Sequence, residues 1–498
     1  MHRHRSRRRK DQKADATPFW ADRSGVNPIT FVLTCLVFLG GLLLGGSGGS
    51  FGDTIVQLLS VPLIVLAAMH WSQSRLDGPD WLALALLSGI ALLAIIQLVP
   101  LPMSTWSALP ERANLLSDLK TTGAQPAWRS VSLNPYATER ALQWTLPAIA
   151  MFLAVRWMSQ RQRRVLLILL FFGAFALLML VTIQHTAQSI DPLARVQAAM
   201  AQAAIGLSSS EGAQTTPETS RMVVGLFSNG NHFATFLAMT IPLVVAMGLR
   251  LYVERTKNQP GTWAPWASLL VLVMVALLVG TIQTHSRAAL VLGGIALAGS
   301  VLLLWRLRLN KILTRSIVAS AVVGSVIAIL FAASVNIAKL DASVGTDLRW
   351  KIHETTLHAA GRFGAFGSGL GTFVQAYQQV PPAEGYLPEY INRAHGDYHE
   401  LWLETGVAGA ALIVLFFCWY GWSSLRAWKD TRLSATRTLI ARGATISILM
   451  VLLHSYLDYP LRKTAMLVLF GMTCALVATT EPIVSKDREK PKELPAGA

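Results

Sequence analysis

The stretch AHGDYHELWLETG, which ends at Gly406, holds the residues whose types and spacing are best suited to chemistry. It contains His395, whose imidazole can change charge near neutral pH, and His399 one helical turn later. Arg349 belongs to the same polar segment, residues 338–403, which lies between two apolar runs. Side chains held outside the lipid but within reach of it can act on a lipid-linked polar substrate. The pattern therefore predicts an active site in this segment.

Composition places the chain among polytopic membrane proteins. Hydrophobic residues make up 53% of the sequence, charged residues only 14%, and the mean hydropathy is +0.45. These values are typical of proteins whose main solvent is lipid. Much of the net charge of +16 lies in short loops between apolar runs, which argues against a nucleic-acid partner.

Apolar runs long enough to cross a bilayer predict an all-α polytopic fold of about twelve transmembrane helices. The predicted spans are residues 29–47, 52–70, 81–99, 139–157, 165–184, 227–249, 264–283, 288–305, 315–337, 404–422, 438–456 and 463–480. About two-thirds of the Lys and Arg residues fall on the side of the N-terminus, which predicts that both termini are cytoplasmic. The segment 338–403 then lies outside and predicts a small helical periplasmic cap.

Several motifs share one predicted membrane face and follow one another in a fixed order. They are GLFSNGNHFATFLAMTIPL, THSRAAL, LRWKIHETT with GSGLGTF, AHGDYHELWLETGVAGA and HSYLDYPLR, with a weaker echo in SLNPYATERALQW. Together they resemble the O-antigen ligase and polymerase superfamily of bacterial surface-polysaccharide assembly. Two positions depart from the family pattern, since Gly396 and Gly230 stand where the family commonly has Asn and Pro.

The resemblance implies four parts of the chain. They are a basic cytoplasmic tail (1–28), an N-terminal transmembrane bundle (29–220), a ligase-related transmembrane region (221–480) that includes the periplasmic loop 338–403, and a disordered cytoplasmic tail (481–498). The first tail, HRHRSRRRK, precedes a run too long for a removable signal peptide. The last tail is rich in Pro, Lys and Glu, a composition typical of disorder.

The resemblance also implies a function, an inner-membrane glycosyltransferase with a periplasmic active site. Family members transfer a glycan from a polyprenyl (undecaprenyl) diphosphate carrier to an acceptor hydroxyl, without a metal or another cofactor. The donor, a glycan or lipid A core acceptor, the bilayer and other polysaccharide assembly proteins are the expected partners. A groove between cap and bundle should admit the polyprenyl chain from the lipid.

The residues that match the family motifs suit this chemistry. Arg287 and Arg349 are expected to clamp the departing diphosphate, because guanidinium groups bind phosphates through charge-assisted hydrogen bonds. His395 is expected to take the proton of the acceptor hydroxyl. Weaker candidates for substrate binding are Arg221, Asn231 and His399.

Each of these residues also has a structural interpretation. His395 could be a structural histidine, Arg287 an interfacial residue that reaches headgroups, and Arg349 an ion-pair partner of Glu354 or Asp347. For four further charged residues the structural interpretation is preferred. Arg362 and Arg393 are expected to be solvated or lipid-facing, and Asp458 is expected to pair with Arg462.

Other kinds of site are not supported. Gly367, Gly369 and Gly371 follow no predicted strand, so they are expected to be turn residues and not a dinucleotide fingerprint. All three cysteines fall inside predicted spans, so neither a disulfide framework nor a cysteine metal site is expected.

Two questions about function stay open at this point. A ligase would pass finished polymer to lipid A core, whereas an O-antigen or exopolysaccharide polymerase would pass the growing chain to the next carrier-linked repeat unit. A transporter or flippase of lipid-linked glycans is the alternative of another class. Transporters place polar sites at mid-membrane, but here the charged residues gather at the outer ends of the predicted helices.

Overall fold

The computed structural model describes residues 25–46, 51–71, 76–124, 126–190, 226–227, 229–258, 264–284, 286–306, 348–380, 390–429 and 436–478. Regular structure in these ranges consists of helices and one antiparallel pair of strands. The elements are α2 (Pro28–Leu44), α3 (Phe51–Trp71), α4 (Gly78–Leu98), β1 (Pro100–Pro102), α5 (Met103–Ser107), α6 (Arg112–Thr121), β2 (Trp128–Ser130), α7 (Pro135–Arg156), α8 (Gln160–Ile190), α10 (Gly230–Asn258), α11 (Ala264–Gln283), α12 (Arg287–Arg306), α14 (Leu348–Phe363), η3 (Gly364–Phe366), α15 (Phe373–Tyr377), α16 (Asp397–Lys429), α17 (Thr436–His454), η4 (Pro460–Arg462) and α18 (Thr464–Ala478).

The predicted spans coincide with helices, apart from 315–337, which lies outside the described residues. Within the described ranges, five helices are long and apolar enough to cross a membrane, namely α3, α4, α8, α10 and α16. Shorter apolar helices include α2, α17 and α18 and parts of α11 and α12. The chain is therefore a multi-pass membrane protein, while the count of twelve spans stays a prediction.

Polar side chains fix where α4 and α7 begin. Asp77 accepts a hydrogen bond from the Asp80 amide, and the Asp80 carboxylate accepts one from the Asp77 amide, which is a capping box. Asn134 caps α7 by accepting from the Ala137 amide at 3.2 Å, and Pro135 follows as the first helical residue. Helix α7 therefore begins beside β2, at the end of the bundle where α4 leads into β1.

Small residues let the helices of the bundle approach closely. Gly443 on α17 faces α10, where an added Cβ would lie 2.8 Å from the carbonyl oxygen of Pro242. Gly471 on α18 is in equally close contact with the backbone of Ala148 on α7. Packing of this kind supplies dispersion energy between helices that lipid alone would not drive together. The core is formed where α10 packs on α17 and α7 packs on α18.

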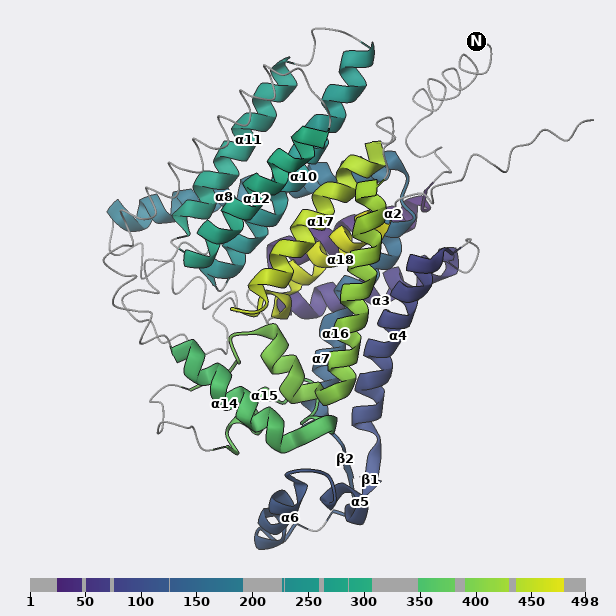
Figure 1. Cartoon of the computed structure of the whole chain (residues 1–498), viewed down its shortest axis with the longest axis vertical. Helices are drawn as coiled ribbons and strands as arrows, with labels where there is room; N and C mark the ends of the chain where they lie inside the picture. Colours follow the sequence, from purple (N-terminus) through teal and green to yellow (C-terminus); the bar gives the residue numbers. More distant parts are fainter. Residues whose placement is uncertain are drawn as a thin grey trace, which may run out of the picture.

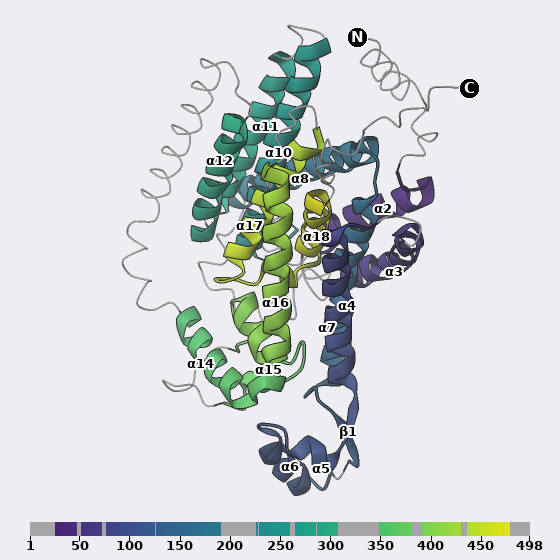
Figure 2. The same cartoon turned by 45° about the vertical axis from the view of Figure 1, so that its right-hand side comes forward.

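Helices α14 and α15 gather with the β1–β2 region at one end of the bundle, beside the first turns of α16 (Figures 1 and 2). We call this the polar end. Arg112, which is buried, ties its two parts together by donating to the carbonyl oxygens of Val131 at 2.8 Å and Gly367 at 3.1 Å. Burial lowers the pKa of Arg112 to about 10.

Helix α16 is interrupted where it leaves the polar end. Gly406 has φ 55° and ψ −140°, so the ladder of helical hydrogen bonds breaks just before it. The glycine-rich turn satisfies the freed carbonyl groups, because the amides of Ser368 and Gly369 donate to Leu403 and Glu404 at 3.0 and 2.9 Å. Where the backbone departs from a helix near lipid, its free N–H and C=O groups have to form hydrogen bonds within the protein in this way. The glycines predicted as turn residues have positive φ and do form the turn.

Candidate active site

His395 sits in a left-handed backbone conformation that its surroundings hold. Its φ is 53°, which is unusual for a residue other than glycine and costs on the order of 1 kcal/mol. Nε2 of His353, on α14, lies 2.9 Å from the carbonyl oxygen of His395 and can donate to it. On the other side, the Asp397 amide donates to the carbonyl oxygens of Ser455 and Asp458 at 2.8 and 3.2 Å. Two segments distant in sequence, α14 and the turn at residues 455–458, therefore fix the loop that carries the histidine.

Gly396 explains one departure from the family pattern. An added Cβ there would lie 2.5 Å from Nδ1 of His399 and 3.0 Å from the carbonyl oxygen of Tyr456. A larger side chain would therefore collide with the ring that packs beside it. In this chain the histidine is oriented by backbone contacts, and the asparagine of the family pattern is not needed for that purpose.

The electrostatic surroundings keep His395 neutral. Burial lowers the pKa of His395 below its ordinary value, Asp458 opposes the shift, and the positive charge of Arg349 adds to it. A neutral imidazole has a lone pair and can accept a proton, as a general base must. The Arg349 guanidinium is partly exposed, and its Nη1 lies 3.5 Å from the carbonyl oxygen of Leu457. Arg349 and His395, predicted from sequence as clamp and base, are therefore close enough for the charge of one to affect the pKa of the other.

Asp458 is a fully buried carboxylate behind His395. It accepts from Nδ2 of Asn231 at 2.8 Å and lies 3.3 Å from Nε2 of His232. Burial alone would raise the pKa of Asp458, but the His232 ring holds it well below the ordinary value. The ring of Tyr459 then joins the two histidines, with its centroid 5.0 Å from His232 and 5.3 Å from His395. Asn231 was predicted to bind substrate, whereas in the structure its side-chain amide donates to the Asp458 carboxylate and supports it.

His399 stacks on the ring that braces the His395 loop. The centroids of His399 and His353 are 4.1 Å apart, with 16° between the ring planes. His399 is buried, and its other aromatic neighbour is Tyr456 at 5.3 Å. Its geometry is that of a packing partner in the wall of the site.

The remaining candidates fall at the edge of the described structure. Arg287 is the first residue of α12, and its side chain lies outside the described part of the chain. Arg221 lies outside the described residues altogether, as does Asp347, one of the alternative partners of Arg349.

Two predictions for charged residues were wrong, and a third is only refined. Arg362 is partly exposed, as a solvated charge would be, and it makes a two-point ion pair with Glu111 at 2.9 and 3.0 Å. Arg393, in contrast, is not solvated, since it donates to the fully buried Glu400 at 2.9 Å. Arg462 pairs with Glu404 at 3.1 Å and Glu400 at 3.3 Å instead of with Asp458.

The ion pairs of Arg393 and Arg462 form a buried network along one face of α16. Asp397, Glu400 and Glu404 follow the i, i+3, i+7 spacing that aligns side chains on a helix, and all three are buried. Arg462 reaches all three from η4, and Arg393 adds a second cation. The spacing of the acidic residues is visible in DYHELWLE, and it could have predicted that this face is paired and not solvated.

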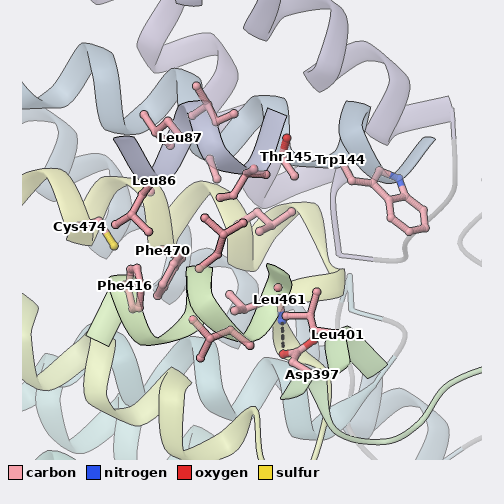
Figure 3. A pocket seen from close by; sticks show the side chains of 18 of the residues that line it. Leu86, Leu87, Trp144, Thr145, Asp397, Leu401, Phe416, Leu461, Phe470 and Cys474 are labelled. Atoms are coloured by element: carbon pink, nitrogen blue, oxygen red, sulfur yellow. Dashed lines mark hydrogen bonds between the residues drawn. The ribbon is translucent and has the colours of Figure 1, made fainter. Parts of the chain in front are cut away.

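An apolar groove runs along the other side of α16. It has a volume of about 340 Å³ and lies between α4, α7, α16 and α18 (Figure 3). Its walls include Leu86, Leu87, Phe416 and Phe470, and its polar end is formed by Asp397 and Arg462. We call it the α4–α16 groove. Its position within the bundle differs from the predicted position between cap and bundle, although it begins next to the His395 loop.

Comparison with known families agrees with the motifs. The family model described as O-Antigen ligase matches residues 272–414, a range that includes Arg287, Arg349, His395 and His399. A search of curated proteins finds no match.

Proposed function

We propose that this membrane protein belongs to the O-antigen ligase superfamily, whose family model matches residues 272–414, and that it transfers a glycan from a polyprenyl diphosphate carrier to an acceptor hydroxyl. The single observation that supports the reaction best is His395 itself, a partly buried imidazole whose loop is held by His353 and whose pKa is lowered by burial and by the nearby charge of Arg349. One group can accept the acceptor proton, and the other can bind the charge that develops on the leaving diphosphate.

The proposed step balances without a further reactant. The acceptor oxygen forms a bond to the anomeric carbon of the donor glycan while the bond from that carbon to the diphosphate oxygen breaks. His395 takes the proton of the acceptor hydroxyl, and the electron pair of the broken bond leaves with polyprenyl diphosphate. Arg349 and Arg287 bind that diphosphate, which is a good leaving group and needs little protonation.

Asp458 supports the base in this proposal. Its carboxylate raises the pKa of His395 against the effect of burial, so that the ring stays basic enough to accept a proton. Asn231 and His232 in turn hold the carboxylate. Asn231 thereby acts through Asp458, and we propose it as a positioning residue and not as a ligand of the substrate.

The polar end faces the periplasm in this proposal, and both termini face the cytoplasm. A lipid-linked donor then meets His395 at the outer surface of the inner membrane. In this proposal the reaction needs neither metal nor cofactor, as the family resemblance implies, and its product belongs to lipopolysaccharide or exopolysaccharide.

A surface-glycan and carrier-lipid profile tests the function. In a deletion strain, the wild-type protein should restore glycan assembly, whereas the His395→Ala protein should not. Long polymer trapped on polyprenyl diphosphate would indicate a ligase, and single repeat units would indicate a polymerase. Lipid-linked glycan held on the cytoplasmic face would indicate a flippase and would contradict the proposal.

A further inference from the structure

The α4–α16 groove is built to hold a hydrocarbon chain. Apolar side chains line it along its length, and Thr145 and Thr405 are uncharged. The charges at its polar end belong to Asp397 and Arg462, which are engaged in the buried network, and the Asp397 carboxylate also accepts from the Leu461 amide at 3.3 Å (Figure 3). The groove therefore offers no charged group along its walls to a polar ligand.

Two arginines and two aromatic rings stand at its mouth. Trp144 lines the groove, and the guanidinium carbons of Arg140 and Arg393 lie 5.7 and 5.5 Å from the centroids of its ring system. Arg140 also lies 5.8 Å from the ring of the exposed Tyr136, one turn earlier on α7. The charge of Arg393 is balanced by Glu400, whereas Arg140 makes no ion pair with any residue in the described ranges. An apolar slot with a cation at its mouth is complementary to a lipid with a phosphate head.

The groove and the His395 cluster are lined by different residues and meet at one short segment, residues 393–397. Asp397 and Arg393, two residues on either side of His395, contact the groove and its mouth. His395 itself is near Asp458, Arg349 and His232, and none of these lines the groove. The helix that begins with Arg287, α12, packs on α10, α11 and α17, whereas the groove lies between α4, α7, α16 and α18.

A general base has to touch the acceptor hydroxyl, and the donor has to reach the same point from elsewhere. If Arg349 and Arg287 take the donor diphosphate, the groove, which neither of these arginines lines, is left for the acceptor. Its volume suits one chain, because cavities of about 300–1,000 Å³ enclose a single small ligand. A lipid with several acyl chains would not fit.

We propose that the α4–α16 groove binds the single isoprenoid chain of a lipid-linked acceptor glycan, with Arg140 on its phosphate and Trp144 at its mouth. This inference rests on the proposed function and narrows it, because an acceptor carried on one isoprenoid chain makes the enzyme a polymerase and not a ligase. Arg140 and Trp144 are positioning residues in this account, since neither is near the reacting atoms.

Kinetics of the full-length protein in nanodiscs test the proposal. The donor would be a repeat unit on polyprenyl diphosphate with its acceptor hydroxyl blocked, and the acceptor would be a repeat unit on a polyprenyl carrier that cannot depart, so that the two concentrations can be varied independently. Arg140→Gln should raise the KM of the acceptor by about tenfold, the effect of one lost charge-assisted contact, and leave the KM of the donor unchanged. Ile90→Trp, which fills the groove, should act in the same way. Glu139→Gln and Ile95→Trp, on the same helices but outside the groove, are the matched controls.

Other results would overturn the proposal. A rise in the donor KM would mean that the groove holds the donor chain, and unchanged kinetics would mean that it holds bulk lipid only. Equal use of a multi-acyl lipid A core acceptor would also contradict it.

A second measurement separates this proposal from the proposed function. A farnesyl phosphate probe carrying a diazirine should crosslink to α4 and α7, and Ile90→Trp should reduce the labelling while Ile95→Trp should not. If the groove is labelled but the protein transfers no glycan, the groove binds lipid and the proposed function is wrong. If the protein transfers glycan but the groove is not labelled, the proposed function stands and the proposed lipid site is wrong.

Discussion

Nε2 of His353 lies 2.9 Å from the carbonyl oxygen of His395, and this contact joins α14 to the loop that carries the proposed base. Since the loop holds His395 at φ 53°, it needs partners that fix a conformation of higher energy. We expect His353→Phe, which keeps a ring but loses the donor, to lower kcat by about three- to tenfold, the range of one hydrogen bond. His353→Gln, which can still donate, should recover part of the loss. An unchanged kcat in the Phe variant would mean that the loop is held without this contact.

The pH profile should identify the base and the groups around it. Because the pKa of His395 is lowered, the acid limb of kcat/KM should have its midpoint below the ordinary histidine value of about 6.5. Activity is lost as pH falls through that midpoint, since protonation removes the lone pair. A midpoint above 6.5 would contradict the burial of a neutral base.

Asp458→Asn and Arg349→Gln should shift that midpoint in opposite directions. Asp458 raises the pKa of His395, so its removal moves the acid limb to lower pH, whereas the removal of Arg349 moves it to higher pH. A purely structural role for either residue would lower activity without a shift. Comparing the midpoints of the two variants with wild type decides between these readings.

Asp458 should also make stability depend on pH. Its folded pKa is well below the ordinary carboxylate value, so its contribution is present above the unfolded pKa, about 3.9, and is lost as pH falls through the folded value. The difference in melting temperature between wild type and Asp458→Asn should therefore shrink as the pH is lowered below about 4. A difference that stays constant across this range would contradict the assignment.

Arg462 holds three buried carboxylates, and its loss should be severe. Arg462→Gln leaves Glu400 and Glu404 without their shared cation, which typically costs about 3–5 kcal/mol. The double variant Arg462→Gln with Glu404→Gln should recover part of the stability, because one buried charge is removed with the cation. Thermal unfolding in detergent measures the stability of both variants. The control is Arg426→Gln, because Arg426 makes a partly exposed ion pair with Asp77 at the other end of α16.

Gly406 and Gly421 on α16 offer a matched pair of substitutions. Gly406→Ala places a Cβ against the carbonyl group of Ala365 in a backbone conformation that disfavours it, so it should destabilise the protein. Gly421 is helical and has open space around it, so Gly421→Ala should be neutral or stabilising by up to about 1 kcal/mol. Equal effects of the two substitutions on melting temperature would mean that the break in α16 is not required.

The positions of the helices could be predicted from the sequence, because each membrane-spanning helix is encoded by one continuous stretch of apolar residues. The sequence also predicted a common site for His395 and Arg349, because both residues lie in one polar segment. The partner of each buried charge was harder to predict, because Arg393, Arg462 and Asp458 each have several oppositely charged candidates nearby in sequence. Only the docking of η4 and the 455–458 turn against α16 decides between them. His232 and His353 were missed for the same reason, since their partners lie on other segments.

The most direct test of the account is the rate of glycan transfer by the purified protein when His395 is replaced by glutamine. We expect His395→Gln to bind the polyprenyl diphosphate donor as tightly as wild type and to lose about a hundredfold or more in kcat, the usual contribution of a general base. Arg349→Gln should instead weaken the binding of polyprenyl diphosphate itself. Transfer by the His395→Gln protein at the wild-type rate would contradict the central claim, because it would mean that His395 is not the general base.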